Sequence, residues 1–269
     1  MRGLAGRLAG AALAIAALPA MVGTDAAAVV AATPPTYVDT IGGGSAGHAD
    51  MYPSGIDVDA AGNIYVADTG DDQVQSYGPG GGLRWVRGSR GLKAPGRFEN
   101  PRDVAFLNGK VYVADTGYNR VQVLNASDGT VDAVWGVRFG TIMGISAGVD
   151  ASGTPVILIA ESSASTIRVY TPGGTSIRSI GTGPGNGAGQ LNQARDAATD
   201  ADGNVYVADY MNSRVAVFGP GGGWIRAWGV NGNNPGQLKR PYGLPALARR
   251  KVINTMISMA GKVKSFMSF

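Results

Sequence analysis

Residues 110–124 read KVYVADTGYNRVQVL, and three other stretches of the chain repeat this pattern. The other copies cover residues 63–77, 156–170 and 204–218. Each copy carries an acidic residue at the same place, and these are Asp68, Asp115, Glu161 and Asp209. Successive acids are 47, 46 and 48 residues apart. A period of this length indicates a repeat architecture in which each cycle forms one structural unit.

One cycle contains four short segments with the composition of β-strands. In the first cycle these segments are residues 54–58, 63–67, 73–77 and 83–87. β-Branched and aromatic residues alternate with other residues in the second and third segments, which is the period of a strand. Gly accounts for 43 of the 269 residues, and Gly destabilises a helix interior by about 1 kcal/mol relative to Ala. The sequence therefore predicts an all-β protein.

Turn residues join the segments at matching places in the cycles. Residues 59–63 (DAAGN) and 200–204 (DADGN) separate the first and second segments, and GPGGG separates the third and fourth at 78–82 and 219–223. Gly supplies positive φ there, and Asp bonds the amides that follow it. Repeated four-stranded antiparallel units predict the blades of a β-propeller. The predicted complete blades cover about residues 51–88, 98–136, 142–181 and 191–229.

The second cycle resembles a known family. Pro101 and residues 111–121 (VYVADTGYNRV) are similar to the NHL repeat, and its final Trp-Gly pair recurs at 135–136 and 228–229. The resemblance covers about residues 36–245, and the third copy departs most, with ESSAST at residues 161–166. The resemblance implies a β-propeller, commonly six-bladed, that acts as a binding platform. Some similar propellers are enzymes, namely amidating lyases and lactonases.

The N-terminus has the pattern of a secretory signal peptide. Arg2 and Arg7 precede an apolar run over residues 8–22, and small residues follow it. The run is too short to span a membrane. We therefore expect residues 1–32 to be a cleavable signal peptide and the protein to be secreted or extracytoplasmic. An uncleaved anchor or a buried helix is the alternative.

Residues 33–245 are predicted to form the propeller, but four blades leave its closure open. Residues 37–42 (YVDTIG) match the closing last strand of a blade, and residues 241–245 match the first strand of a further blade. The chain is then either closed by a fifth blade or truncated from a six-bladed ring. Residues 246–269 lose the repeat, and three alternatives stand for this basic tail: a frame-shifted end, an amphipathic helix on a membrane or partner, or a degenerate blade.

The formal net charge of +4 comes from the two ends of the chain. Residues 33–245 contain 16 Lys and Arg against 18 Asp and Glu, so the predicted propeller carries a charge of −2. This balance and the expected export argue against a nucleic-acid partner. A locally basic stretch either binds a polyanion or forms a solvated rim. It consists of Arg84, Arg87, Arg90, Lys93, Arg97 and Arg102.

Composition limits the possible chemistry. The chain has no Cys and one His, His48, which excludes thiolate nucleophiles and multi-His metal sites within one chain. Because a residue that recurs in every blade usually serves the blade itself, Asp68, Asp115 and Asp209 are expected to cap strand ends. Two of them are expected to pair with Arg120 and Arg214 of their own repeat. We therefore expect no catalytic residue, no metal and no cofactor.

A second acidic motif resembles the start of a calcium-binding loop. It is Asp200-x-Asp202-x-Asn204, but Val205 and Met211 stand where such a loop needs Gly and Glu. We therefore predict a turn at this motif.

The candidate binding site follows from the architecture. Loops that lead into the innermost strands of a propeller converge on its axial channel, and Ser54 also lies at such a position. Arg-Asp occurs there twice, where the family more often has Arg-Gly or another small residue. A mixture of charged and aromatic side chains can hold a polar ligand or a peptide. The predicted ligand-binding residues are Arg102, Asp103, Arg195, Asp196 and Tyr242. Arg–Asp pairing that only closes the channel mouth is the alternative.

Two functional hypotheses follow from these observations. The first is an exported non-catalytic propeller that binds a protein, a peptide or a glycan. The second is an enzyme of the lyase or lactonase type that uses carboxylates and a divalent metal, for which Glu161 is the one unusual acid in the repeats.

Overall fold

The computed structural model describes residues 52–244, except residues 90, 92, 137 and 138. All of these belong to one compact unit of the chain, Asp50–Phe269. The expected signal peptide (1–32), the closing strand (37–42), His48 and the tail (246–269) lie outside the described residues. Among the residues that are described, no helix is long and apolar enough to cross a membrane.

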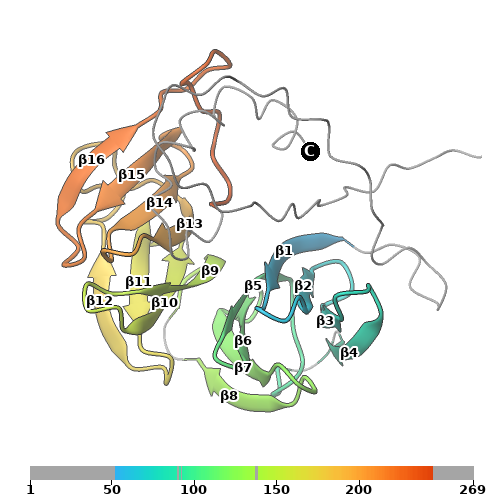
Figure 1. Ribbon diagram of the computed structural model, residues 1–269. Helices are drawn as coiled ribbons and strands as arrows, with labels where there is room; N and C mark the ends of the chain where they lie inside the picture. The colour runs from blue at the N-terminus through green and yellow to red at the C-terminus, as the bar shows by residue number, and fades with distance from the viewer. Residues whose placement is uncertain (1–51, 90, 92, 137–138, 245–269) are drawn as a thin grey trace, which may run out of the picture. The chain divides into compact units, whose positions relative to one another are not determined.

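The described strands form four antiparallel sheets of four strands each (Figure 1). The first sheet contains β1 (Pro53–Val58), β2 (Ile64–Asp68), β3 (Gln73–Tyr77) and β4 (Leu83–Gly88). The second contains β5 (Pro101–Leu107), β6 (Lys110–Asp115), β7 (Arg120–Asn125) and β8 (Val131–Trp135). The third contains β9 (Ile142–Val149), β10 (Pro155–Glu161), β11 (Thr166–Tyr170) and β12 (Ser176–Ile180). The fourth contains β13 (Ala194–Thr199), β14 (Val205–Asp209), β15 (Arg214–Phe218) and β16 (Trp224–Trp228).

This architecture confirms the prediction of an all-β propeller with four-stranded antiparallel blades. Within each sheet the strands pair in chain order, so every blade is a meander. The inner strands contact one another in the order β1, β5, β9 and β13. Figure 1 shows these four strands on the inner side of the sheets and β4, β8, β12 and β16 on the outer side. Residues 241–244, expected to begin a further blade, pair with no strand in the described part of the chain.

Apolar side chains fill the space between consecutive blades. One buried cluster joins Tyr65 and Val74 of the first blade to Val104 and Val113 of the second. Equivalent clusters lie between the second and third blades and between the third and fourth. The ring of Tyr65 also stacks on Phe106 with ring centroids 5.5 Å apart. Consecutive blades therefore bury their facing surfaces against each other, as expected for a repeat unit that cannot form a core alone.

The Asp-Gly-Asn turns have the conformation that their sequence predicts. Asp200 Oδ1 accepts the backbone amides of Asp202 and Asn204, and Asp200 Oδ2 accepts hydrogen bonds from the Asn204 amide and the Tyr206 hydroxyl. Gly203 has a φ of 78°, a value that costs Gly little. Both carboxylate oxygens are engaged within the turn. The motif is therefore a turn, as predicted.

The acid that recurs in each blade is also used structurally. Arg120 Nε lies 2.7 Å from Asp115 Oδ2, and Arg214 Nε lies 2.7 Å from Asp209 Oδ2, so both predicted ion pairs are present. Asp68 accepts hydrogen bonds from the Tyr52 amide and the Gln75 side chain.

In the third blade, the recurring acid pairs with an arginine at a different position. Its acid, Glu161, pairs with Arg168, seven residues along the chain, and accepts the amide of Gly140. Because both carboxylate oxygens have partners in the blade or in the loop before it, Glu161 is engaged in the same structural role as the other acids.

Candidate functional site

The inner strands carry an interruption of their pairing at the predicted site. The register of β1 with β2 shifts between Pro53 and Gly55, and that of β5 with β6 shifts between Pro101 and Asp103. A similar break occurs at the start of β13, between Ala194 and Ala197. Such bulges re-aim a side chain away from the regular alternation. Arg102 and Arg195 are the residues at these breaks in the second and fourth blades.

Glycine and aspartate alternate from blade to blade at one position near the start of the inner strands. Gly55, Asp103, Gly144 and Asp196 occupy this position in the four blades. A Cβ atom on Gly55 would overlap Asp103, and one on Gly144 would overlap the carbonyl oxygen of Arg195. At this position, neighbouring inner strands therefore lie too close together for every blade to carry a side chain.

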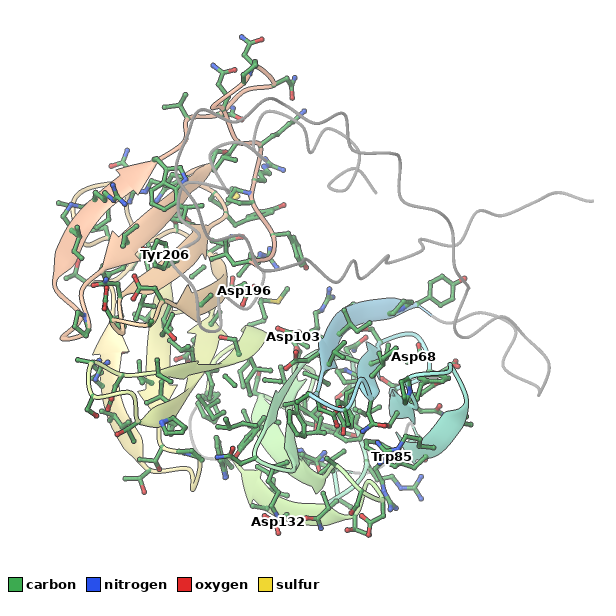
Figure 2. The ribbon with its side chains drawn as sticks, in the orientation of Figure 1. Asp68, Trp85, Asp103, Asp132, Asp196 and Tyr206 are labelled. Carbon is green, nitrogen blue, oxygen red and sulfur yellow. The ribbon has the colours of Figure 1, made fainter. Side chains whose placement is uncertain are left out.

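Each of the two carboxylates, labelled in Figure 2, accepts a backbone amide from the next cycle of the repeat. Asp103 accepts the amides of Val104 and Ile145, both at 2.9 Å. Asp196 accepts the amides of Ala197 at 2.7 Å and Leu244 at 2.6 Å. Neither acid takes part in the ion pairs found among the described residues. The carboxylates are thus held by backbone amides. Asp103 and Asp196 do not form the Arg–Asp pairs that were the alternative for the channel mouth.

Burial raises the pKa of both carboxyl groups above the usual value. Desolvation raises the pKa of Asp196 to about 7. Desolvation also raises the pKa of Asp103 well above its usual value, and the neighbouring charge of Asp196 raises it further. Two buried carboxylates that sense each other do not both ionise readily at neutral pH. One of them can therefore hold a proton and act as a hydrogen-bond donor.

The arginines beside these acids lack strong partners. Arg102 Nε and Arg195 Nε are buried and have no hydrogen-bond partner, as is also the case for Arg178 Nε on the outer strand β12. Arg195 Nη2 makes one long hydrogen bond, 3.4 Å, to Gln193 Oε1. Buried polar groups are usually satisfied in folded proteins. The two equivalent arginines on the inner strands therefore have hydrogen-bonding capacity that the described chain does not use.

Aromatic rings hold Arg195 instead. Its Cζ lies 4.5 Å from the ring centroid of Tyr210 and 5.3 Å from that of Tyr242. The two tyrosine rings meet edge to face, with centroids 6.0 Å apart. The exposed Arg240 also lies over Tyr210, at 5.7 Å. The structure thus brings the predicted residues Arg195 and Tyr242 together, and it adds Tyr210 and Arg240.

The backbone around Arg240 is fixed by the fourth blade. Three residues that precede a cycle of the repeat have positive φ: Asn100 (48°), Gln193 (52°) and Arg240 (51°). The side chain of the preceding blade's turn accepts each amide: Asp72 accepts from Asn100, Ser165 from Gln193, and Ser213 from Arg240. Arg240 therefore starts from a backbone position that the repeat determines.

Three members of the predicted basic stretch donate hydrogen bonds to the second blade. On β4, Arg84 donates to the carbonyl oxygen of Ala126, and Arg87 donates to that of Gly129. Lys93 donates to the Tyr118 carbonyl oxygen and lies over its ring. These three side chains contact the second blade, and Arg84 and Lys93 remain exposed. Binding of a polyanion by the stretch stays a prediction. In the described part of the chain, no three His, Asp or Glu residues are grouped in a way that suits a metal ion.

A family model described as NHL repeat matches three stretches of the chain, residues 51–77, 98–124 and 191–218. These stretches run from the first into the third strand of the first, second and fourth blades. The third blade, whose sequence departs most from the repeat, is not among them. No curated protein matches the sequence.

Solved structures with a similar fold include two lyases. Virginiamycin B lyase from Staphylococcus aureus aligns with a TM-score of 0.51 and 16% identity over 65% of this chain and 55% of its own. Streptogramin B lyase aligns with a TM-score of 0.54 and 18% identity over 71% and 57%. Hydrazine synthase from Kuenenia stuttgartiensis aligns with a TM-score of 0.50 and 14% identity over 70% and 52%. The chain thus spans between half and three-fifths of these structures, and such identities concern the fold alone.

Proposed function

We propose that this β-propeller with NHL repeats is an exported, non-catalytic scaffold that binds a protein, a peptide or a glycan at its inner-strand mouth. One observation carries the proposal. Arg102 and Arg195, at equivalent bulges, each keep a buried Nε without a partner, and an unpaired buried donor costs about 1–3 kcal/mol. A ligand acceptor would recover that cost. Asp103, Asp196 and Tyr242 complete the proposed site.

The repeated acids and turns support this location by elimination. Asp68, Asp115, Glu161 and Asp209 each have their partners inside the blade or the loop before it. The mouth residues instead differ between consecutive blades, since Arg-Asp stands in the second and fourth blades and glycine replaces the acid in the first and third. Residues that break a repeat are better candidates for a specific function than residues that obey it.

Binding is tested with the folded protein immobilised against a glycan array and against proteins secreted by the source cells. We expect a partner that is retained by the wild type and lost by Arg102→Ala and by Tyr242→Ala. Lys110→Ala is the matched control, because Lys110 pairs with Asp132 at the surface of the second blade. The absence of any partner, or equal loss in the control, would count against the scaffold. Fusing residues 1–32 to a reporter tests export separately.

A lyase or lactonase activity is the second candidate, and the coupled pair Asp103 and Asp196 favours it. A carboxyl with a pKa of about 7 is well matched to general acid or base catalysis at neutral pH. One neighbouring structure is a catalytically inactive His-to-Ala variant of virginiamycin B lyase with quinupristin. The single His of this chain, His48, lies outside the described residues. Turnover of quinupristin or of a lactone that is lost in Asp196→Asn would support this candidate over the scaffold.

A further inference from the structure

Tyr210 occupies a place where other blades carry a structural hydroxyl. In the first blade Thr69 Oγ1 donates to the carbonyl oxygen of Pro101, at 2.6 Å. In the second blade Thr116 Oγ1 donates to that of Ile142, at 2.7 Å. Both bonds tie the end of a second strand to the start of the next inner strand. The fourth blade gives up this link and places a large phenol ring there.

The Tyr210 ring lies beneath two arginines that form no ion pair among the described residues. Arg195 and Arg240 both lie over Tyr210, at 4.5 and 5.7 Å from its centroid. Neither is part of an ion pair among the described residues. A guanidinium stacked on an aromatic face keeps its N–H edge available for a planar acceptor. The two groups are therefore positioned by the rings without being neutralised by them.

We propose that Arg195 and Arg240, supported by Tyr210 and Tyr242, bind the carboxylate of an Asp or Glu side chain in an acidic peptide. This inference rests on the proposed function and names its ligand class. The guanidinium fork matches a carboxylate through two parallel hydrogen bonds. Tyr and Arg are also the residues that contribute most to protein recognition sites.

The surroundings suit a peptide. Tyr242, two residues after Arg240, and Met211, which follows Tyr210, are each 44% exposed. They offer apolar surface to the residues on either side of an acidic side chain. The nearest acid along the chain, Asp196, has both oxygens engaged by the amides of Ala197 and Leu244. Its carboxyl therefore does not occupy the guanidinium edges.

The probe is a fluorescein-labelled peptide rich in Glu, and fluorescence anisotropy at about 150 mM NaCl measures its affinity. A peptide with Gln in place of every Glu is the ligand control. We expect Arg195→Gln and Arg240→Gln each to weaken binding of the Glu peptide at least about tenfold. Arg195→Lys keeps the charge but loses the fork, and we expect its affinity to lie closer to Arg195→Gln than to the wild type.

Arg226→Gln is the matched control variant. Arg226 also lies over an aromatic ring, that of Trp228 at 5.4 Å, but on the outer strand β16. Its affinity for the Glu peptide should equal that of the wild type. Thermal unfolding of each variant checks folding, and the exposed Arg240 provides a variant that leaves the core intact.

Several results would overturn the proposal. They are equal affinity for the Glu and Gln peptides, equal loss in Arg226→Gln, and Arg195-dependent binding of a phosphoserine peptide that is tighter than binding of the Glu peptide. The proposed function has a separate readout. If the array or the secreted proteins yield a partner that Arg102→Ala releases while the Glu peptide does not bind, only the ligand class is wrong. If no partner and no peptide binds, the scaffold itself is wrong.

Discussion

Arg120 and Asp115 show how a single buried charge pair supports a blade. Their side chains are 4% and 0% exposed. The guanidinium also donates to the carbonyl oxygens of Ala94 and Arg97, and the carboxylate also accepts the amide of Glu99. Burial raises the pKa of Asp115 despite its Arg120 partner. The pair therefore joins the loop before the second blade to its hairpin, and each member depends on the other.

Arg120→Ala is expected to lower the free energy of unfolding by about 3–5 kcal/mol, because it leaves a buried carboxylate without its cation. Lys110→Ala removes a surface ion pair whose members are 32% and 44% exposed, and we expect a loss below about 1 kcal/mol. Urea unfolding of both variants measures the difference. Similar losses would show that burial does not set the strength of these pairs.

Asp196 predicts a pH dependence of stability. Its pKa rises from 3.8 to about 7 on folding, so the folded state binds a proton more tightly than the unfolded chain. The stabilising contribution is fully present below the unfolded pKa and is lost as pH rises through about 7. The pKa values of Asp57 and Asp103 shift in the same direction through burial.

We expect the urea midpoint to rise when the pH falls from about 8 to about 5, and Asp196→Asn to reduce that rise. Asp132→Asn provides the surface control, since Asp132 is about half exposed and pairs with Lys110. An unchanged pH profile in Asp196→Asn, or an equal change in Asp132→Asn, would contradict this account.

Among the elements, the inner strands are linked to one another by side-chain hydrogen bonds. Links between neighbours include Asp57 accepting the amide of Phe106 and Thr199 accepting that of Val149. Ser146 donates to the carbonyl oxygen of Ala197 across the same interface. Side chains thus replace the ladder hydrogen bonds that separate sheets cannot share. The inner strands lie so close together that no side chain fits at Gly55 or Gly144.

Gly144→Ala tests this approach. The added Cβ would overlap the carbonyl oxygen of Arg195 and crowd the Cα of Asp196, and we expect a loss of about 1–3 kcal/mol in unfolding free energy. Gly80→Ala is the control, because nothing lies within 4 Å of its added Cβ. We expect the control to change stability by less than about 1 kcal/mol. Equal effects on thermal unfolding would show that the inner strands can separate without cost.

Strand positions were predictable because their signals are local. The expected strands of the first blade end within one residue of β1–β4, since Asp and Gly in the turns determine where pairing stops. Residues that act across blades were not predictable in this way. Tyr210 was missed, although its departure from Thr69 and Thr116 in the repeat was a visible signal. Pairing of Glu161 with Arg168 rather than with a residue five positions on was likewise not visible in the pattern.

At the scale of the whole molecule, the excess of positive charge lies at the two ends of the sequence. Taken alone, the basic pI of about 9.4 suggests a polyanion partner. The contacts of individual basic side chains change this interpretation. Arg84 and Arg87 bond carbonyl oxygens of the second blade, and residues 33–245 have more acids than bases. The positive charge available to phosphates is therefore smaller than the composition implies.

We expect no retention of double-stranded DNA by the folded protein at about 150 mM NaCl, because residues 33–245 carry more acids than bases and would displace few counterions from the DNA. Electrophoretic mobility shift with a random duplex measures this. A shift that disappears steeply with added salt would contradict the prediction, and Arg195→Gln would then show whether the anion site is responsible.

The alternation of Gly55, Asp103, Gly144 and Asp196 has a consequence for protein engineering. Each Asp fits only beside a neighbour that lacks a side chain at that level. Placing two glycine-bearing blades, such as the first and the third, side by side would leave a void at this level. Placing the two Asp-bearing blades, the second and the fourth, side by side would bring like charges together. Chimeras of this scaffold should therefore exchange modules two at a time, keeping every acid with its glycine.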